Sequence, residues 1–84
     1  MNRKHKKTLA AIFAEPTRAN IKWDDVAGLL VHLGAIVAMR GGSMFSFTLR
    51  KSRVVLHRPH PGDQLTKPGV RSVRDFLKDA GVGP

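Results

Sequence analysis

Two histidines that could transfer protons, His57 and His60, stand on either side of Arg58 in a proline-containing segment. Histidine suits general acid–base work because its unperturbed pKa of about 6.5 lies near neutral pH. An arginine beside it can hold a phosphate group through paired hydrogen bonds. The pattern predicts acid–base chemistry beside a phosphate group, with His57 and His60 as acid and base. The phosphate would be held by Arg40, Arg53 and Arg58.

The same segment also has a structural interpretation. Three prolines and one glycine between Arg58 and Pro68 restrict its backbone, so the two histidines could form a corner or face water. Their spacing resembles that of zinc ligands, but the chain has no cysteine and only Asp63 lies nearby as a third ligand. Because a structural zinc site needs four protein ligands, we predict neither a metal site nor a cofactor.

Charge is the strongest global feature of the chain. Fifteen Lys and Arg residues stand against six Asp and Glu, which gives a formal net charge of +9. So basic a chain favours a polyanionic partner, since each neutralised phosphate releases counterions. General basicity without a specific partner is the alternative, as is a DNA-binding or architectural protein. The latter would prefer duplex DNA to RNA at equal salt.

The length of 84 residues and the hydrophobic fraction of 42% predict one small domain with a modest core. The lack of cysteine fits a reducing cytoplasm, and no apolar run approaches the roughly 18 residues of a membrane span. The only tryptophan, Trp23, and Phe45 could act as stacking platforms for bases, but core packing is favoured because aromatic residues are few.

Hydrophobic spacing predicts three helices. The first runs from about Lys6 to Glu15, before Pro16, and the second from Trp23 to Leu33, before Gly34. A last helix carries Val70, Val73, Phe76, Leu77 and Ala80 on its inner side and ends at Gly81.

Three strands are predicted between the second and the last helix: Ala35–Met39, Met44–Leu49 and Arg53–His57. Short turns join them, with Ser43 as a turn residue in the first, so an antiparallel meander is expected. The fold class is therefore α+β: a three-stranded antiparallel sheet with helices packed on one face.

Most of the sequence resembles a known protein family. The resemblance runs from about Trp23 to Val82, and it rests on three segments: Gly42-Ser43 before an alternating strand, Arg53-Val-Val-Leu-His57-Arg-Pro-His60-Pro, and Val70-Arg-Ser-Val-Arg-Asp-Phe-Leu-Lys-Asp-Ala-Gly81. These are similar to the HicA-type messenger-RNA interferase toxins. The resemblance implies an α-β-β-β-α core like that of double-stranded-RNA-binding domains, metal-free cleavage of mRNA, and silencing by a HicB-like antitoxin protein. Residues 1–21 would be a basic N-terminal extension with a short helix, and 22–82 the core.

One departure from the family stands at the catalytic position. The family has a histidine one or two residues after the Gly-Ser pair, where this chain has Met44 and Phe45. Neither side chain can exchange a proton, which leaves two hypotheses: an endoribonuclease that uses other residues, or an inactive module that binds RNA or the antitoxin. In both, the residues expected to bind RNA are Arg40, Ser43, Lys51, Arg53, Arg58, Arg71 and Arg74.

Overall fold

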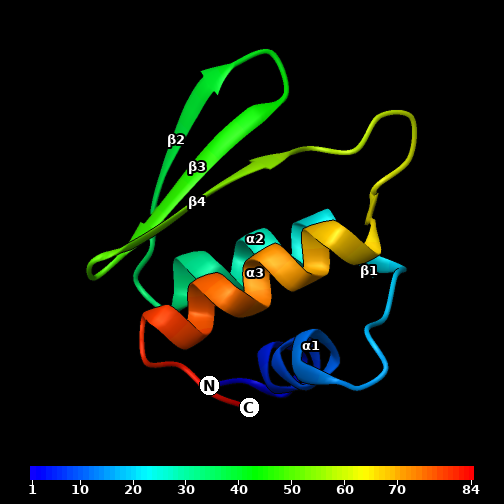
Figure 1. The fold of residues 1–84 in the computed structure, drawn as a ribbon, viewed down its shortest axis with the longest axis vertical. Helices are drawn as coiled ribbons and strands as arrows, with labels where there is room; N and C mark the ends of the chain where they lie inside the picture. The colour runs from blue at the N-terminus through cyan, green and yellow to red at the C-terminus, as the bar shows by residue number, and fades with distance from the viewer.

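The computed structural model describes all 84 residues and has three helices and two antiparallel sheets. The elements are α1 (Arg3–Phe13), β1 (Ile21–Lys22), α2 (Trp23–His32), β2 (Ile36–Gly41), β3 (Met44–Leu49), β4 (Ser52–His57), β5 (Gln64–Leu65) and α3 (Lys67–Asp79). Figure 1 shows three layers: the sheet of β2, β3 and β4, then α2 and α3 side by side, then α1. The predicted α+β class is confirmed, and α1 packs on the two other helices instead of on the sheet.

The main sheet is an antiparallel meander in the order β2-β3-β4. Phe47 pairs with Val37 on one side and Val54 on the other, and Phe45 pairs with Met39 and Leu56. Alternate residues of a strand point to opposite faces, so Phe45, Phe47 and Leu49 of β3 share the face that meets the helices. This is the face that the alternation in the sequence predicts.

The core is one cluster of 17 buried residues that lies between the sheet and the helices α2 and α3 and continues between these helices and α1. Trp23 begins α2, is only 3% exposed, and lies with its ring centroid 5.4 Å from that of Phe45 and 5.9 Å from that of Phe47. Aromatic pairs at this separation add to the stability gained from burial. Leu29, Leu30 and the inner side of α3 complete the packing, as the helical spacing predicts.

Two glycines end α2 and α3 in the same way. Gly34 and Gly81 have φ angles of 101° and 81°, in the left-handed region that glycine adopts without steric cost. The next amide then reaches back five residues, from Ala35 N to Leu30 O at 2.9 Å and from Val82 N to Leu77 O at 2.8 Å. These bonds are those of the Schellman motif, and they fix the residue at which each helix ends.

The structure differs from several predicted boundaries, among them the start of β4, which is Ser52 instead of Arg53. Helix α1 begins at Arg3, earlier than Lys6, because the Asn2 side chain accepts a hydrogen bond from His5 N at 2.7 Å and caps the first turn. Strand β2 continues to Gly41, into the predicted turn, through a bulge after Met39. The loop after β4 also contains β5, which pairs with β1. Two-residue strands carry too little periodicity to be recognised in a sequence.

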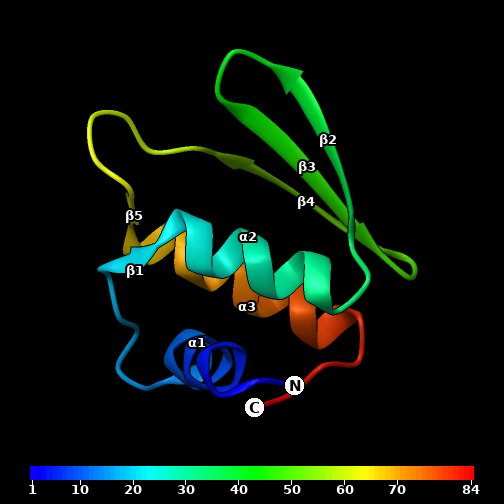
Figure 2. The same cartoon turned by 180° about the vertical axis from the view of Figure 1, so that it is seen from behind.

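Strand β2 is paired on one side only, and all six of its residues are exposed. Ile36 and Met39 are 72% and 68% exposed. Figure 2 shows why: β2 is the strand of the sheet farthest from the helices. None of the three helices combines the length and the hydropathy that a membrane crossing requires.

Arg74 is the charged residue that holds α1 to α3. It is 9% exposed, and its guanidinium donates to Ile12 O at 3.0 Å, Ala14 O at 2.9 Å and Glu15 Oε1 at 3.0 Å. The first two acceptors are carbonyls at the C-terminal end of α1, which lack helical partners. This corrects the expectation that Arg74 faces RNA, because the side chain is buried and three of its five N–H donors bond within the fold.

Replacing Arg74 tests this contact. Arg74→Ala should lower the free energy of unfolding by about 2–3 kcal/mol, since one buried and one partly buried carbonyl lose their donor. Arg71→Ala, at an exposed position of the same helix, should change it by no more than about 0.5 kcal/mol. Urea unfolding followed by circular dichroism measures both, and equal effects for the two variants would contradict the assignment.

Candidate active site

His57 stands beside Met44, the first of the two positions at which the family could have its histidine. It is the last residue of β4, and its register partner is Met44, the first residue of β3. Directly opposed residues of an antiparallel pair lie on the same face, with Cβ atoms about 4.5–5.5 Å apart. The chain therefore carries an exposed imidazole on the strand next to the substituted position.

A cavity of about 320 Å³ lies between β4 and the start of α3 and has His57 in its wall. Two hydroxyl groups in the wall are engaged locally: Thr66 Oγ1 accepts from Gly69 N at 3.3 Å, and Ser72 Oγ donates to Pro68 O at 3.1 Å. His57 is the only histidine and the only ionisable side chain in the wall. The other wall residues are Val55, Leu56, Pro59, Leu65, Thr66, Pro68, Gly69 and Ser72.

Arg58 joins the loop after β4 to the turn between β2 and β3. Its backbone N donates to Ser43 O at 2.7 Å, which continues the β3–β4 ladder by one residue. Its side chain lies 3.5 Å from Asp24 Oδ1 at the start of α2, and both side chains are exposed. An exposed pair of this length contributes little stability, so the Arg58 guanidinium can turn to an incoming anion.

His60 is not brought into contact with His57. It lies in the exposed loop before β5, and no hydrogen bond or ring contact joins the two side chains. The predicted acid–base pair is therefore not assembled in this structure. No three His, Asp or Glu side chains gather closely enough to hold a metal ion.

The residues predicted to bind RNA divide between the two ends of the sheet. Arg40, in the bulge of β2, lies near Ser43 and Arg58 at the end that carries His57. Lys51, in the β3–β4 turn, and Arg53, paired with Thr48, lie toward the other end. Arg71 is exposed on α3. The structure thus presents these cations along the length of the sheet and not as one cluster.

Arg50 was not among these residues, and it has a structural role. Its Nη1 donates to Ala80 O at the end of α3, where the last carbonyls of a helix need partners. Gly81 follows directly, and a Cβ there would stand 3.0 Å from Arg50 Nη1. The contact ties the β3–β4 turn to the end of α3.

The fold and the site together define a class: a small basic protein with an α-β-β-β-α core and one exposed histidine at the end of a three-stranded sheet. The chain belongs to the HicA toxin family, because the family described as "HicA toxin of bacterial toxin-antitoxin" matches residues 23–82. Membership implies an antitoxin as partner. Helix α1 lies outside the matched residues. No curated protein and no solved structure matches the chain.

The burial of Trp23 excludes it as a stacking platform in the folded state and confirms it as a core residue. Because it is the only tryptophan, its fluorescence reports on this position alone. We expect acrylamide to quench the native protein several-fold less than the urea-unfolded chain, since the quencher must reach the indole. Equal Stern–Volmer constants in the two states would contradict the placement of Trp23.

Proposed function

We propose that this chain is the toxin of a type II toxin–antitoxin pair, that it binds messenger RNA in the cytoplasm, and that it cleaves the strand without a metal. The observation that supports the proposal best is the pairing of His57 with Met44. His57 shares a face of the sheet with Met44, the first of the two residues that stand where the family has its histidine. It also lines a cavity between β4 and the start of α3.

The chemistry would be transfer of the phosphoryl group to the neighbouring ribose oxygen. A base takes the proton of the 2′-hydroxyl, the 2′-oxygen bonds to phosphorus, and the bond from phosphorus to the 5′-oxygen breaks as an acid protonates that oxygen. His57 would serve one of these proton transfers. The Arg58 guanidinium would offset the charge that gathers on the phosphate oxygens. His60 would supply the second proton transfer if the loop folds over the bound strand.

RNA binding would rest on the cations of the sheet and its turns. Of the fifteen Lys and Arg residues, only Lys4, Arg58 and Arg74 form ion pairs within the chain. Arg40, Lys51, Arg53 and Arg71 are exposed and have none. Such free cations favour a phosphate backbone, whose binding is driven largely by the release of counterions.

The antitoxin would be a HicB-like protein that masks this surface. Two properties support a protein partner: the excess of positive charge, which suits an acidic protein, and the apolar side chains on β2. Ile36, Val37 and Met39 are exposed on a strand with a free edge, where a partner can bury them.

Binding without cleavage is the second candidate function. His57 has no hydrogen bond that would orient its ring, whereas catalytic histidines are commonly held by a third group. Met44 and Phe45 add no proton donor or acceptor. On this alternative the chain captures RNA or the antitoxin but leaves the RNA intact.

Cleavage of a labelled RNA in the presence of a chelator tests the assignment of His57. His57→Ala should reduce the cleavage rate by about a hundredfold or more, because general acid–base catalysis contributes at least that much. His60→Ala reports on the second proton transfer. Met44→His places a histidine at the first of the family's two possible positions and should raise the rate by about tenfold or more.

The controls separate the two candidate functions. His32→Ala removes a histidine on α2, away from the sheet, and should leave the rate unchanged. If the wild type binds RNA but cuts none of it, while Met44→His does cut, the chain is a binding module. Binding of duplex DNA in preference to RNA at equal salt would rule out the RNA proposal.

The salt dependence of RNA binding tests the role of the sheet cations. For a single strand, each phosphate contact contributes about 0.7 to the slope of log K against log salt. Arg53→Gln should lower the magnitude of the slope by about this amount. Lys6→Gln, which removes one charge from the exposed side of α1, should not. Fluorescence anisotropy at several salt concentrations gives both slopes. An equal decrease in slope for the two variants would indicate a general effect of net charge and not a phosphate contact of Arg53.

A further inference from the structure

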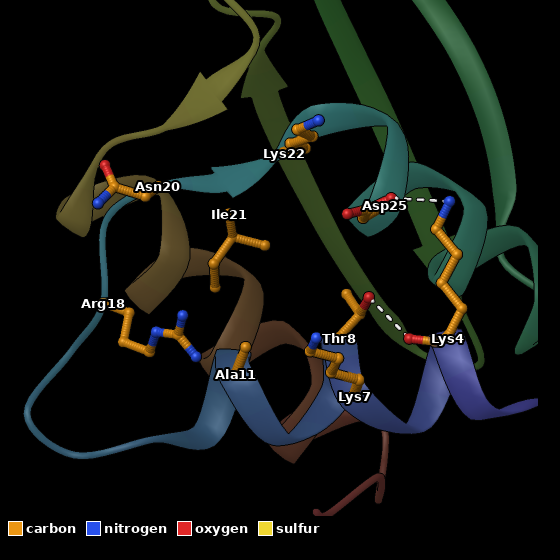
Figure 3. A pocket seen from close by; sticks show the side chains of 9 residues that line it. All are labelled: Lys4, Lys7, Thr8, Ala11, Arg18, Asn20, Ile21, Lys22 and Asp25. Carbon is orange, nitrogen blue, oxygen red and sulfur yellow. Dashed lines mark hydrogen bonds and ion pairs between the residues drawn. The ribbon is translucent and has the colours of Figure 1, made fainter.

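A second cavity lies where the N-terminal extension meets the start of α2. Its volume is about 310 Å³, and Figure 3 shows the residues that line it, which come from α1, from the segment after α1, from β1 and from the first turn of α2. The wall residues are Lys4, Lys7, Thr8, Ala11, Arg18, Asn20, Ile21, Lys22 and Asp25. All except Asp25 precede the matched family residues 23–82.

The cavity has a surplus of positive charge. Four of its nine wall residues are Lys or Arg, and only Asp25 is acidic. That carboxylate is already paired with Lys4 Nζ at 3.3 Å. Lys7, Arg18 and Lys22 have no ion pair in the structure. Cations gathered around one hollow repel one another, and a bound anion would remove that cost.

The preference for an anion rests on these cations. Helix α2 begins at the same cavity with Lys22 as its N-cap residue and no side chain to cap it, but the Trp23 amide donates to Asp63 O at 2.6 Å, and Asp24 and Asp25 stand in the first turn. These groups already offset the positive end of the helix. Thr8 Oγ1 donates to Lys4 O at 3.0 Å, so the hydroxyl proton is used and the remaining donors of the wall are mostly cationic.

The wall does not suit a nucleobase. Only Ala11 and Ile21 are hydrophobic, and there is no aromatic ring on which a base could stack. Base recognition depends on such platforms and on hydrogen-bonding edges held in place. The volume is at the lower end of the range for small-ligand sites, which is about 300–1,000 Å³. A short chain of phosphoryl groups fits both the charge and the size.

We propose that this cavity is a phosphate-binding site that recognises phosphoryl groups by charge, whatever base or sugar they carry. The phosphate could come from a free polyphosphate or from the backbone of an RNA strand. The site goes beyond the proposed cleavage of RNA and does not depend on it, because it uses none of the residues around His57.

Binding of pyrophosphate at low salt, measured by isothermal titration calorimetry, tests the site. The double variant Lys7→Gln/Arg18→Gln removes two cations from the wall. It should weaken binding by about tenfold or more, as expected for the loss of two charge-assisted contacts. The matched control is Lys6→Gln/Lys67→Gln, which has the same net charge but alters neither cavity wall. It should keep the affinity within about twofold.

A second titration identifies the source of the phosphate. Uridine and adenosine diphosphate should bind as pyrophosphate does, because the wall ignores the base. If pyrophosphate does not bind but a single-stranded oligonucleotide loses affinity in the cavity variant and not in the control, the site is real and its phosphate belongs to RNA. Equal losses in the two double variants, or none in either, overturn the proposal. Cleavage by the same variants is measured separately, so a failure of this site is distinguished from a failure of the His57 assignment.

Discussion

The buried guanidinium of Arg74 is the contact that fixes the outermost layer, α1, against α3. It reaches from α3 to the end of α1 and satisfies two carbonyls that no helical amide can reach. Its ion pair with Glu15 adds less, because that carboxylate is 74% exposed. With α1 fixed in this way, the stacked rings of His5 and His32, 4.7 Å apart, and the Lys4–Asp25 pair hold its other turns to α2. The cation-rich cavity exists only because α1 is held at this place.

The register of the sheet has the same importance for the candidate active site. A shift of one residue between β3 and β4 would turn His57 to the opposite face and separate it from Met44. Two features oppose such a shift. A two-residue turn joins Leu49 to Ser52, and the bond from Arg58 N to Ser43 O closes the ladder at the other end. The burial of Phe47 adds a third constraint, because only one register places it in the core.

Much of this architecture could be predicted from the sequence, and the failures have physical reasons. Alternation in β3 and the spacing of Val70, Val73 and Leu77 identify the buried faces, since burial acts directly on these patterns. Arg74 follows Arg71 at ordinary helical spacing, and nothing local shows that one is buried and the other exposed. The pairing of His57 with Met44 depends on whether the turn before β4 includes Ser52. If β4 starts at Arg53, as the sequence predicts, the residue that pairs with His57 is not determined. In the structure β4 starts at Ser52, which is buried and whose Oγ donates to Phe76 O at 3.0 Å.

The free edge of β2 has a consequence for how the protein behaves without a partner. An unpaired strand with exposed apolar side chains is a template for the edge of another chain, and natural sheets usually protect such edges with charge or proline. Here Arg40 is the only charged residue on the strand. Repulsion between molecules that each carry a net charge of +9 is therefore the main barrier to edge-to-edge pairing of their β2 strands. Salt shortens the range of that repulsion to roughly 8 Å at physiological strength. Electrostatic repulsion is therefore what keeps the free protein from aggregating, and a high salt concentration removes this protection.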